Sequence, residues 1–570
     1  MNQRTGADLI AATLKARGVQ RVFALCGGHI MPIWMALDAA GIEIVDVRDE
    51  RAAVYMAHAS AAVAGGFGVA LVTAGPGVTN AMTGIANAHV SRVPVLVLSG
   101  TPPRPQENRG ALQDMSHVAL VQSITRIART VRHAPALPRE LDAAIGAALG
   151  HGGEPGPAFI DVPVDVQREG LPEVLFAVEQ IAGRARPRSR AFDDDLDRAA
   201  AMILAAERPV LISGRGANGA AAELARFLDA SGAAYLDTGE TKGIVPESHP
   251  AHVGAMRGAV MTGADLVITL GRKLDFQLAY GAPAVFGAAR LLRISDVAQE
   301  LTDNRLGEVA LLGDVAETLE RLSDRLAGRP ATRDWLRGLR AQHVQRSAGL
   351  ADALSSAQSD SAGRLHPNRL LAEIRKRLDP DAVVIADGGD FLSFARVALS
   401  SSTYLDPGPL GCIGLATPFA IGAAKAAPGR QVVAVTGDGA FGFSAMEIDT
   451  AVRHGAPVMI VVSNNGAWAI EVRDQMDRFG KAVGTELQVA DYAAMARAFG
   501  LKAWRIEGEA ALAPSLDAAF AALADGHAVL IDAVTSPEAR SSDSKTGLAW
   551  VPDLQALAAW DDAERRWLEG

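Results

Sequence analysis

Residues 431–440 read QVVAVTGDGA, an apolar run that ends in Gly437-Asp438-Gly439. Residues 458–465 read VMIVVSNN, a second apolar run that ends in Asn464-Asn465. Both runs are typical of buried parallel strands, and polar residues after such strands gather at one edge of an open α/β sheet, where ligands bind. Gly-Asp-Gly alone is more often a plain turn, whereas its pairing with Asn-Asn at this spacing is specific. The two stretches therefore predict an α/β fold with a ligand site at their ends.

The residues at these strand ends suit a magnesium ion that binds phosphate. Asp438, Asn465 and the backbone carbonyl of Ala467 can supply the oxygen ligands that Mg²⁺ prefers. Gly439 and Ala440 open the next helix, so their N–H groups would face phosphate oxygens. Two further glycines, Gly388 and Gly389, follow another apolar run and would let the backbone approach the same phosphates closely.

The same alternation of strand-like and helical segments runs through the whole chain. Alanine-rich helical stretches separate the short apolar runs, which is the pattern of parallel βαβ units. The apolar runs lie at residues 21–25, 42–47, 68–73, 94–99, 158–162, 208–213, 234–237, 265–270, 290–295, 382–387, 431–436, 458–463 and 528–533. We therefore expect three doubly wound parallel-sheet domains of the α/β class, a number that also fits a length of 570 residues.

Changes in composition indicate the domain boundaries. The first domain is expected at residues 1–180, and the Pro- and Arg-rich stretch at 184–190 is typical of a linker. The central domain is expected at 190–345 and the third domain at 360–535. A C-terminal tail at 536–570 begins with Ser and Asp residues that cannot form a core element, and then recovers apolar residues.

Charge and cysteine content exclude several classes of function. The chain has 65 Asp and Glu residues against 55 Lys and Arg residues, a net charge of −10 that offers no basic surface to nucleic acid. Its two cysteines, Cys26 and Cys412, form no C-x-x-C pattern, which favours a reducing, cytoplasmic location. Neither a signal peptide nor an apolar stretch of about 18 residues is present, so we expect no membrane segment and no processing.

Together, the Gly-Asp-Gly and Asn-Asn motifs resemble the signature of thiamine-diphosphate enzymes of the acetolactate synthase and pyruvate decarboxylase superfamily. Asn465 lies 27 positions beyond Asp438, and the resemblance extends over essentially the whole chain. It implies a pyrimidine-binding, a central and a diphosphate-binding domain, in that order, with thiamine diphosphate held through Mg²⁺. It also implies a homodimer at least, and commonly a homotetramer, because this superfamily builds each active site between two subunits.

The resemblance assigns roles to residues outside the metal motif. Glu50 matches the glutamate that hydrogen-bonds the pyrimidine ring, so that the cofactor's own nitrogen can remove the proton from the thiazolium C2 atom. From its position alone, Glu50 is better explained as a favourable acidic residue at a helix N-terminus, and the flanking family pattern reverses that interpretation. Ile413 matches the apolar wedge between the two rings, where relatives often have Met or Leu. The carbonyl of Gly411 would accept a hydrogen bond from the aminopyrimidine.

Further segments resemble particular members of the superfamily. His29 and Gln113 are similar to residues of benzaldehyde lyase, whereas acetolactate synthases usually have a proline-rich loop in place of His29 and a Phe in place of Leu112. A closer resemblance is to the actinobacterial type of 2-hydroxyacyl-CoA lyase. This resemblance covers residues 27–34, 47–50, 56–59, 74–80, 213–217, 468–471 and 547–553. It implies that His29 and Gln113 contact the substrate oxygen, as acid-base groups can near neutral pH, and that Glu471 faces the substrate.

The central domain and the tail carry weaker signals. Residues 213–216 read SGRG after an apolar run, a turn that occurs in nucleotide sites and equally in tight strand-to-helix packing. Related enzymes bind FAD, ADP or CoA in this domain, and the residues around Arg272 favour ADP or CoA. Arg215, Arg272 and Arg293 are the candidates for phosphate contacts. The tail, including Lys545, is expected either to close over the active site as a lid or to have no role.

The leading hypothesis is a thiamine-diphosphate-dependent carbon–carbon lyase that cleaves a 2-hydroxyacyl-CoA to formyl-CoA and an aldehyde or ketone. The reverse direction is an acyloin-type condensation. One alternative is an acetolactate synthase or a benzaldehyde-lyase-like carboligase that acts on free 2-keto acids or aldehydes. A second alternative is a scaffold protein that retains the fold without catalysis, which the presence of Glu50, Asp438 and Asn465 disfavours.

Overall fold

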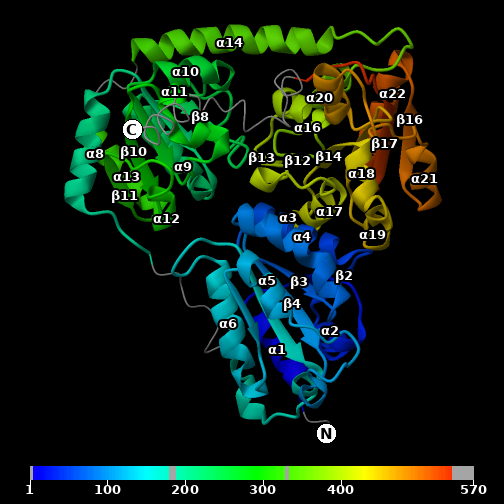
Figure 1. Ribbon diagram of the computed structural model, residues 1–570. Coiled ribbons are helices and arrows are strands. Elements are labelled where there is room, and N and C mark those ends of the chain that lie inside the picture. The colour runs from blue at the N-terminus through cyan, green and yellow to red at the C-terminus, as the bar shows by residue number, and fades with distance from the viewer. Residues whose placement is uncertain (1–3, 179–187, 328–332, 542–570) are drawn as a thin grey trace.

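The computed structural model describes residues 4–178, 188–327 and 333–541, which form three α/β units (Figure 1). Each unit is built on one sheet whose strands are all parallel. The predicted linker at 184–190 lies largely outside the described residues, as does the tail from residue 542 onward. The described helices include none with the length and apolar character that a membrane span needs.

The first unit has the strand order β2-β1-β3-β4-β6-β5. Its strands are β1 (Arg21–Ala24), β2 (Glu43–Asp46), β3 (Gly68–Val72), β4 (Val95–Thr101), β5 (Ile127–Thr130) and β6 (Pro157–Pro163). Its α-helices are α1 (Gly6–Ala16), α2 (Met31–Ala39), α3 (Glu50–Ala64), α4 (Pro76–Val90), α5 (His117–Val121), α6 (Leu137–Ala148) and α7 (Val164–Gln167). Helices cover both faces of the sheet, as in a doubly wound fold.

The central unit has the order β11-β10-β9-β7-β8. Its strands are β7 (Pro209–Ser213), β8 (Ala234–Leu236), β9 (Leu266–Leu270), β10 (Arg290–Ser295) and β11 (Val309–Leu312). Its α-helices are α8 (Asp193–Ala205), α9 (Ala221–Ser231), α10 (Arg257–Gly263), α11 (Pro283–Phe286), α12 (Ala298–Leu301) and α13 (Val315–Leu326). The long helix α14 (Asp334–Ser355) then crosses from the central unit to the third (Figure 1).

The third unit repeats the topology of the first, with the order β13-β12-β14-β15-β17-β16. Its strands are β12 (Val383–Ala386), β13 (Thr403–Leu405), β14 (Val432–Gly437), β15 (Met459–Asn464), β16 (Lys502–Ile506) and β17 (Val529–Val534). Its α-helices are α15 (Pro367–Arg375), α16 (Asp390–Ala398), α17 (Ala416–Ala426), α18 (Asp438–Ser444), α19 (Glu447–Arg453), α20 (Ala469–Phe479), α21 (Tyr492–Ala498) and α22 (Glu509–Ala524).

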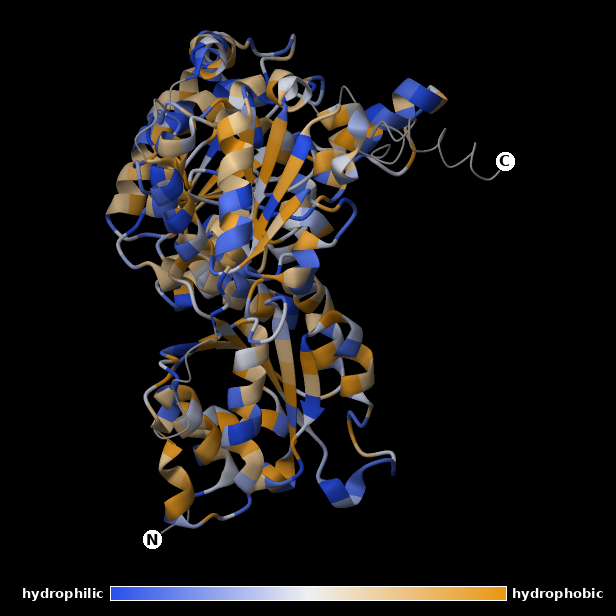
Figure 2. Cartoon of the chain, turned by 90° about the vertical axis from the view of Figure 1, so that its left-hand side faces the viewer, coloured by the Kyte–Doolittle hydropathy of each residue, from blue (hydrophilic) through white to orange (hydrophobic). Residues whose placement is uncertain are grey.

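The inner strands of all three sheets are buried on both faces, as their apolar composition requires. Every residue of β3, β7 and β12 is buried. Figure 2 shows apolar residues concentrated along the strands, with polar residues more frequent on the surrounding helices. The order in which the parallel strands are added to the sheet reverses between β12 and β14, and such a reversal of strand order leaves a crevice beyond the strand ends where ligands bind.

Four strands were missing from the sequence prediction: β5, β11, β13 and β16. All four lie at an edge of their sheet. A strand at an edge is less enclosed than an inner strand, so its residues need not be continuously apolar. The exposed positions within β5, β11 and β16 interrupt the pattern that identified the inner strands.

Helix α3 of the first unit packs along helix α17 of the third (Figure 1). The ring of Phe419 contacts Tyr55 edge-on and lies beside His58. The two helices approach so closely at Gly422 that a Cβ atom there would lie 2.3 Å from the carbonyl oxygen of Met56. This interface fixes α3, whose first residue is Glu50, against the third sheet.

We predict that Gly422→Ala weakens this interface, because the added methyl group would overlap backbone that cannot move aside. Overpacking of this kind costs about 1–3 kcal/mol of stability. The measurement is the thermal unfolding midpoint. Gly338→Ala is the matched control, since Gly338 lies in α14 with open space around its Cβ position. An unfolding midpoint for Gly422→Ala equal to that of the control would contradict the predicted overlap.

Candidate functional site

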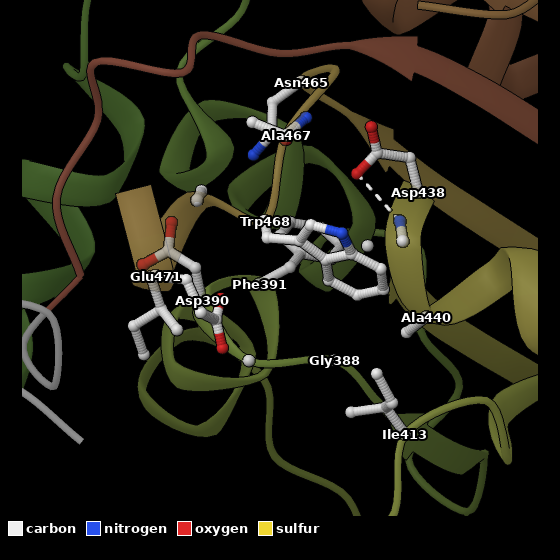
Figure 3. A pocket seen from close by; sticks show the side chains of 15 residues that line it. Gly388, Asp390, Phe391, Ile413, Asp438, Ala440, Asn465, Ala467, Trp468 and Glu471 are labelled. Carbon is white, nitrogen blue, oxygen red and sulfur yellow. Dashed lines mark hydrogen bonds between the residues drawn. The ribbon is translucent and has the colours of Figure 1, made fainter. Parts of the chain in front are cut away.

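A pocket opens at the carboxyl ends of β12, β14 and β15, where the strand order reverses (Figure 3). Three strand-to-helix turns and the loop before α17 supply its lining. The lining residues are Gly388, Gly389, Asp390, Phe391, Ile413, Gly437, Asp438, Gly439, Ala440, Asn465, Ala467, Trp468, Ala469, Ile470 and Glu471. The structure therefore brings together all the predicted cofactor and metal residues except Gly411, which lies two positions from Ile413 but does not line the pocket.

Asp438 ties two of these turns together. One carboxylate oxygen accepts a hydrogen bond from the backbone N–H of Gly466 at 2.7 Å, and the other accepts from Gly439 at 3.0 Å. The side chain is almost fully buried, and burial raises the pKa of Asp438 to about 6. A cation beside it would favour the ionised form, because a bound metal is the largest local charge in such a site.

The two asparagines of the Asn-Asn motif have different surroundings. Asn464 is fully buried, and its amide donates to a carboxylate oxygen of Asp532 and to the carbonyl of Ala490. Asn465 lines the pocket, and its side-chain oxygen accepts from the N–H of Ala467 at 3.1 Å. Asn464 is thus bound within the fold, whereas Asn465 lines the same pocket as Asp438 and carries an amide oxygen of the kind that a hard cation binds.

The glycines of the pocket bring backbone close to its interior. Gly388 has a φ of +94°, a conformation that favours glycine. A Cβ atom at Gly439 would lie 2.5 Å from the ring of Trp468. These close approaches and the oxygen donors of Asp438 and Asn465 fit the expected diphosphate and its Mg²⁺ ion.

Asp387 positions the loop that carries the expected wedge, a role that sequence analysis missed. Its side chain is fully buried and accepts hydrogen bonds from the N–H groups of Gly388, Gly414 and Ala416, at 2.6, 2.9 and 3.0 Å. Burial raises the pKa of Asp387 to about 6. These bonds join the turn after β12 to the loop around Ile413. The sequence indicated only that Asp387 stands at the end of a strand.

In the view of Figure 3, Glu471 and Asp390 lie across Trp468 from Asp438. Burial raises the pKa of Glu471, and the nearby carboxylates of Asp474 and Asp390 act in the same direction. Asp390 is paired with Arg473 at 2.8 Å. Arg473 also donates to the carbonyl of Pro537, so α20 is joined to the first residues of the tail.

The predicted residues of the first unit form a second group at the carboxyl edge of its sheet. Glu50 is the first residue of α3, and one of its buried carboxylate oxygens accepts from Asn80 at 3.1 Å. The side chains of His29 and Gln113 interact; burial lowers the pKa of His29, and the hydrogen bond with Gln113 offsets part of this effect. Gln113 has a φ of +63°, a strained conformation for a residue other than glycine, of the kind that gathers at functional sites.

His117 supports this group, although no motif in the sequence pointed to it. Its Nε2 atom accepts a hydrogen bond from the N–H of Gly75 at 2.8 Å, so Nδ1 carries the proton in the neutral ring. Nδ1 lies 3.2 Å from a carboxylate oxygen of Asp161, and both side chains are buried. The pair fixes the Gly75 turn, which packs against Gln113.

Glu50, His29 and Gln113 are absent from the lining of the pocket in the part of the chain that the structure describes. The two groups of predicted residues therefore occupy the carboxyl edges of two different sheets. A single ligand that contacts both groups would have to span two such edges.

Comparison with known proteins identifies the architecture. Residues 4–120 match the thiamine pyrophosphate enzyme N-terminal TPP binding domain, residues 196–322 the central domain, and residues 387–533 the C-terminal TPP binding domain. These matches follow the order of the three sheets.

Relatives extend over almost the full chain. A probable acetolactate synthase of Mycobacterium bovis is 34% identical over 542 residues, which cover 93% of this chain and 95% of the relative. The 2-hydroxyacyl-CoA lyase 2 of Homo sapiens is 31% identical, and the match covers 93% of this chain and 90% of the relative. The 2-hydroxyacyl-CoA lyase of Oryza sativa subsp. japonica is 29% identical, and the match covers 91% of this chain and 93% of the relative. The chain therefore belongs to the thiamine pyrophosphate enzyme family, in the superfamily that includes acetolactate synthases and 2-hydroxyacyl-CoA lyases.

Proposed function

We propose that the protein is a thiamine-diphosphate-dependent lyase that cleaves 2-hydroxyacyl-CoA to formyl-CoA and an aldehyde or ketone, and that it also catalyses the reverse condensation. The observation that carries this choice within the family is the charge of the pocket. The described residues that line it include no Lys, Arg or His. Of its two carboxyl groups away from Asp438, that of Asp390 is paired with Arg473, so Glu471 supplies the negative charge there. Such a surface disfavours the carboxylate of a free 2-keto acid and accepts a neutral thioester or carbonyl group.

The proposed cofactor site uses the residues of the third unit. Asp438, Asn465 and the carbonyl of Ala467 would hold Mg²⁺, and Gly388, Gly389, Gly439 and Ala440 would face the diphosphate. No cluster of three or more His, Cys, Asp or Glu side chains suited to a metal occurs within the described residues. Mg²⁺ commonly completes its coordination with substrate phosphates and water, so a site with few protein ligands is consistent with it.

Bound thiamine diphosphate supplies a carbon nucleophile and an electron sink for the bond that is made or broken. Glu50 would hold the pyrimidine ring by a hydrogen bond, with Asn80 fixing the carboxylate. His29, whose lowered pKa keeps it neutral near pH 7, would take the proton of the substrate hydroxyl during cleavage and return it during condensation. Gln113 would orient His29 and the substrate oxygen. Glu471 would contact the carbonyl partner.

We further propose that the active form is at least a homodimer, because the pocket lacks Glu50 of its own chain. In a dimer, the first unit of one subunit could cover the third unit of another. Apolar side chains near the pocket residues support such a contact: Leu410, Phe443 and Met446 are each more than 40% exposed. A homotetramer and a cytoplasmic location stay predictions.

An acetolactate synthase remains the second candidate, because the Mycobacterium bovis relative carries that name. The proposal of ADP or CoA in the central domain has less support, since Arg272 and Arg293 are buried and paired with Asp275 and Asp303. The lid role of residues 536–570 also stays a prediction.

We predict that Glu50→Gln reduces the rate of C2 hydrogen exchange of bound thiamine diphosphate by about 100-fold or more, as expected for loss of acid-base catalysis. The fold should persist, because the amide can keep the contact with Asn80. The measurement is NMR after quenching in D₂O, and Glu173→Gln on the exposed surface of the first unit is the control. Exchange at the wild-type rate would remove Glu50 from the mechanism.

We predict that Asp438→Asn weakens Mg²⁺-dependent binding of thiamine diphosphate by at least about tenfold, a loss of roughly 1.4 kcal/mol. The substitution removes the anionic ligand but keeps an oxygen for backbone N–H groups. Calorimetric titration of the cofactor at fixed Mg²⁺ measures the effect. Asp449→Asn, at a partly buried position in the next helix, should leave the affinity unchanged, and equal affinities for both variants would argue against the metal site.

We predict that the holoenzyme releases formyl-CoA from a 2-hydroxyacyl-CoA and forms no acetolactate from pyruvate. Glu471→Gln should lower the inhibition constant of pyruvate by about tenfold, because a neutral amide removes roughly 1.4 kcal/mol of repulsion. Product analysis by mass spectrometry and competition kinetics test the two statements. Acetolactate as the main product would instead support the second candidate.

A further inference from the structure

We propose that Glu447 of the third unit positions Glu50 of the first, by holding the backbone of the turn from which α3 begins. This role rests on the proposed function, since it presumes that Glu50 acts on the cofactor. Glu447 would touch neither cofactor nor substrate. It would act through the orientation of the β2–α3 turn.

The carboxyl group of Glu447 is buried, and it contacts the backbone of the turn directly. Glu447 is 1% exposed, and one of its carboxylate oxygens accepts from the N–H of Arg48 at 3.0 Å. The N–H of Asp49 also donates to this carboxylate. The second oxygen accepts from the hydroxyl of Thr450 at 2.7 Å, which fixes the rotamer of Glu447. Arg48 and Asp49 are the two residues immediately before Glu50.

These two N–H groups lie between regular elements. The ladder of β2 ends at Asp46, and the N–H of Val47 donates to the carbonyl of Ala24. Helix α3 begins at Glu50, with Asp49 as its N-cap. A backbone N–H group that is shielded from water by a neighbouring segment needs an acceptor on that segment. Glu447 provides it from a position 399 residues away in sequence.

Ion pairing does not account for a buried carboxyl at this place. Among the described residues, Glu447 forms no salt bridge, and the guanidinium of Arg48 pairs with Asp449 instead. Burial raises the pKa of Glu447 to about 7, so the fold bears a cost to keep a carboxyl here. A group retained at such a cost is expected to serve positioning rather than stability alone.

The location of Glu447 gives the contact a functional consequence. Helix α18 (Asp438–Ser444) begins at the expected metal ligand Asp438, and the next helix, α19, begins at Glu447. Arg51 also donates to the carbonyl of Phe443 in this segment. The segment that begins at the metal ligand Asp438 therefore also holds the turn that carries Glu50 of the same chain, although in the proposed dimer this Glu50 would act on the cofactor site of the other subunit.

The test compares Glu447→Ala with Asp449→Ala in the full-length protein. Asp449 lies one half-turn away on α19 and contacts the side chain of the same Arg48, but not its backbone. Hydrogen–deuterium exchange mass spectrometry of the cofactor-free protein reports on the amides of residues 46–51. The C2 exchange rate and the calorimetric affinity of thiamine diphosphate report on the loaded enzyme.

We expect Glu447→Ala to accelerate amide exchange in residues 46–51 by about tenfold or more and to slow C2 exchange by a similar factor, as loss of a part-buried hydrogen bond implies. Cofactor affinity should change by less than about threefold, a difference below roughly 1 kcal/mol. Asp449→Ala should change none of these quantities appreciably. Glu447→Gln retains an oxygen acceptor and should restore most of the C2 exchange rate.

Equal effects of Glu447→Ala and Asp449→Ala would overturn the proposal, as would faster amide exchange without slower C2 exchange. If Glu447→Ala does not fold, Glu447→Asp carries the same comparison, because its shorter side chain withdraws the acceptor and keeps the charge. Failure of the proposed function is distinguishable, since Glu50→Gln would then leave C2 exchange at the wild-type rate.

Discussion

The site depends on one hydrogen bond between neighbouring strand ends, from the backbone N–H of Gly466 to the carboxylate of Asp438. It draws the turn after β15 toward the turn after β14, so that Asn465 and Asp438 line one pocket. Parallel strands bring their carboxyl ends to the same edge, and the reversal between β12 and β14 leaves that edge open. The hydrogen bond converts an open edge of the sheet into a site with defined oxygen donors.

Three buried carboxyl groups repeat this arrangement. Asp387, Asp438 and Glu447 each accept backbone N–H groups from another segment, and burial raises the pKa of each, to about 6, 6 and 7. Because these values exceed those of exposed carboxyls, ionisation of the three groups lowers folding stability as the pH rises from about 4 toward 7. A metal ion beside Asp438 would reverse this effect for that group alone. These carboxyl groups therefore position the backbone around the pocket, and their ionisation lowers the folding stability.

The sequence predicted the inner strands and the chemistry attached to their ends, because continuous apolar runs and the residues that follow them are local features. It missed the edge strands β5, β11, β13 and β16, whose partial exposure breaks the apolar pattern. It also missed His117, Asp387 and Glu447. The importance of these side chains lies in contacts with segments distant in sequence, such as the 399 residues between Arg48 and Glu447. Contacts of this kind produce no periodicity or motif in the amino-acid sequence.

The arginines predicted to meet phosphates illustrate the same limit. Arg272 binds Asp275 and Glu240, and Arg293 binds Asp303, while Arg92 of the first unit reaches Glu240 and Glu300 in the same buried network. Removing one partner from a fully buried ion pair costs about 3–5 kcal/mol. Arg272 and Arg293 are fully buried, so a phosphate that recruited either arginine would leave its partly buried carboxylate partner unpaired. The network instead joins the first and central units through opposite charges. A nucleotide on the central unit would therefore have to bind through backbone N–H groups or more exposed cations.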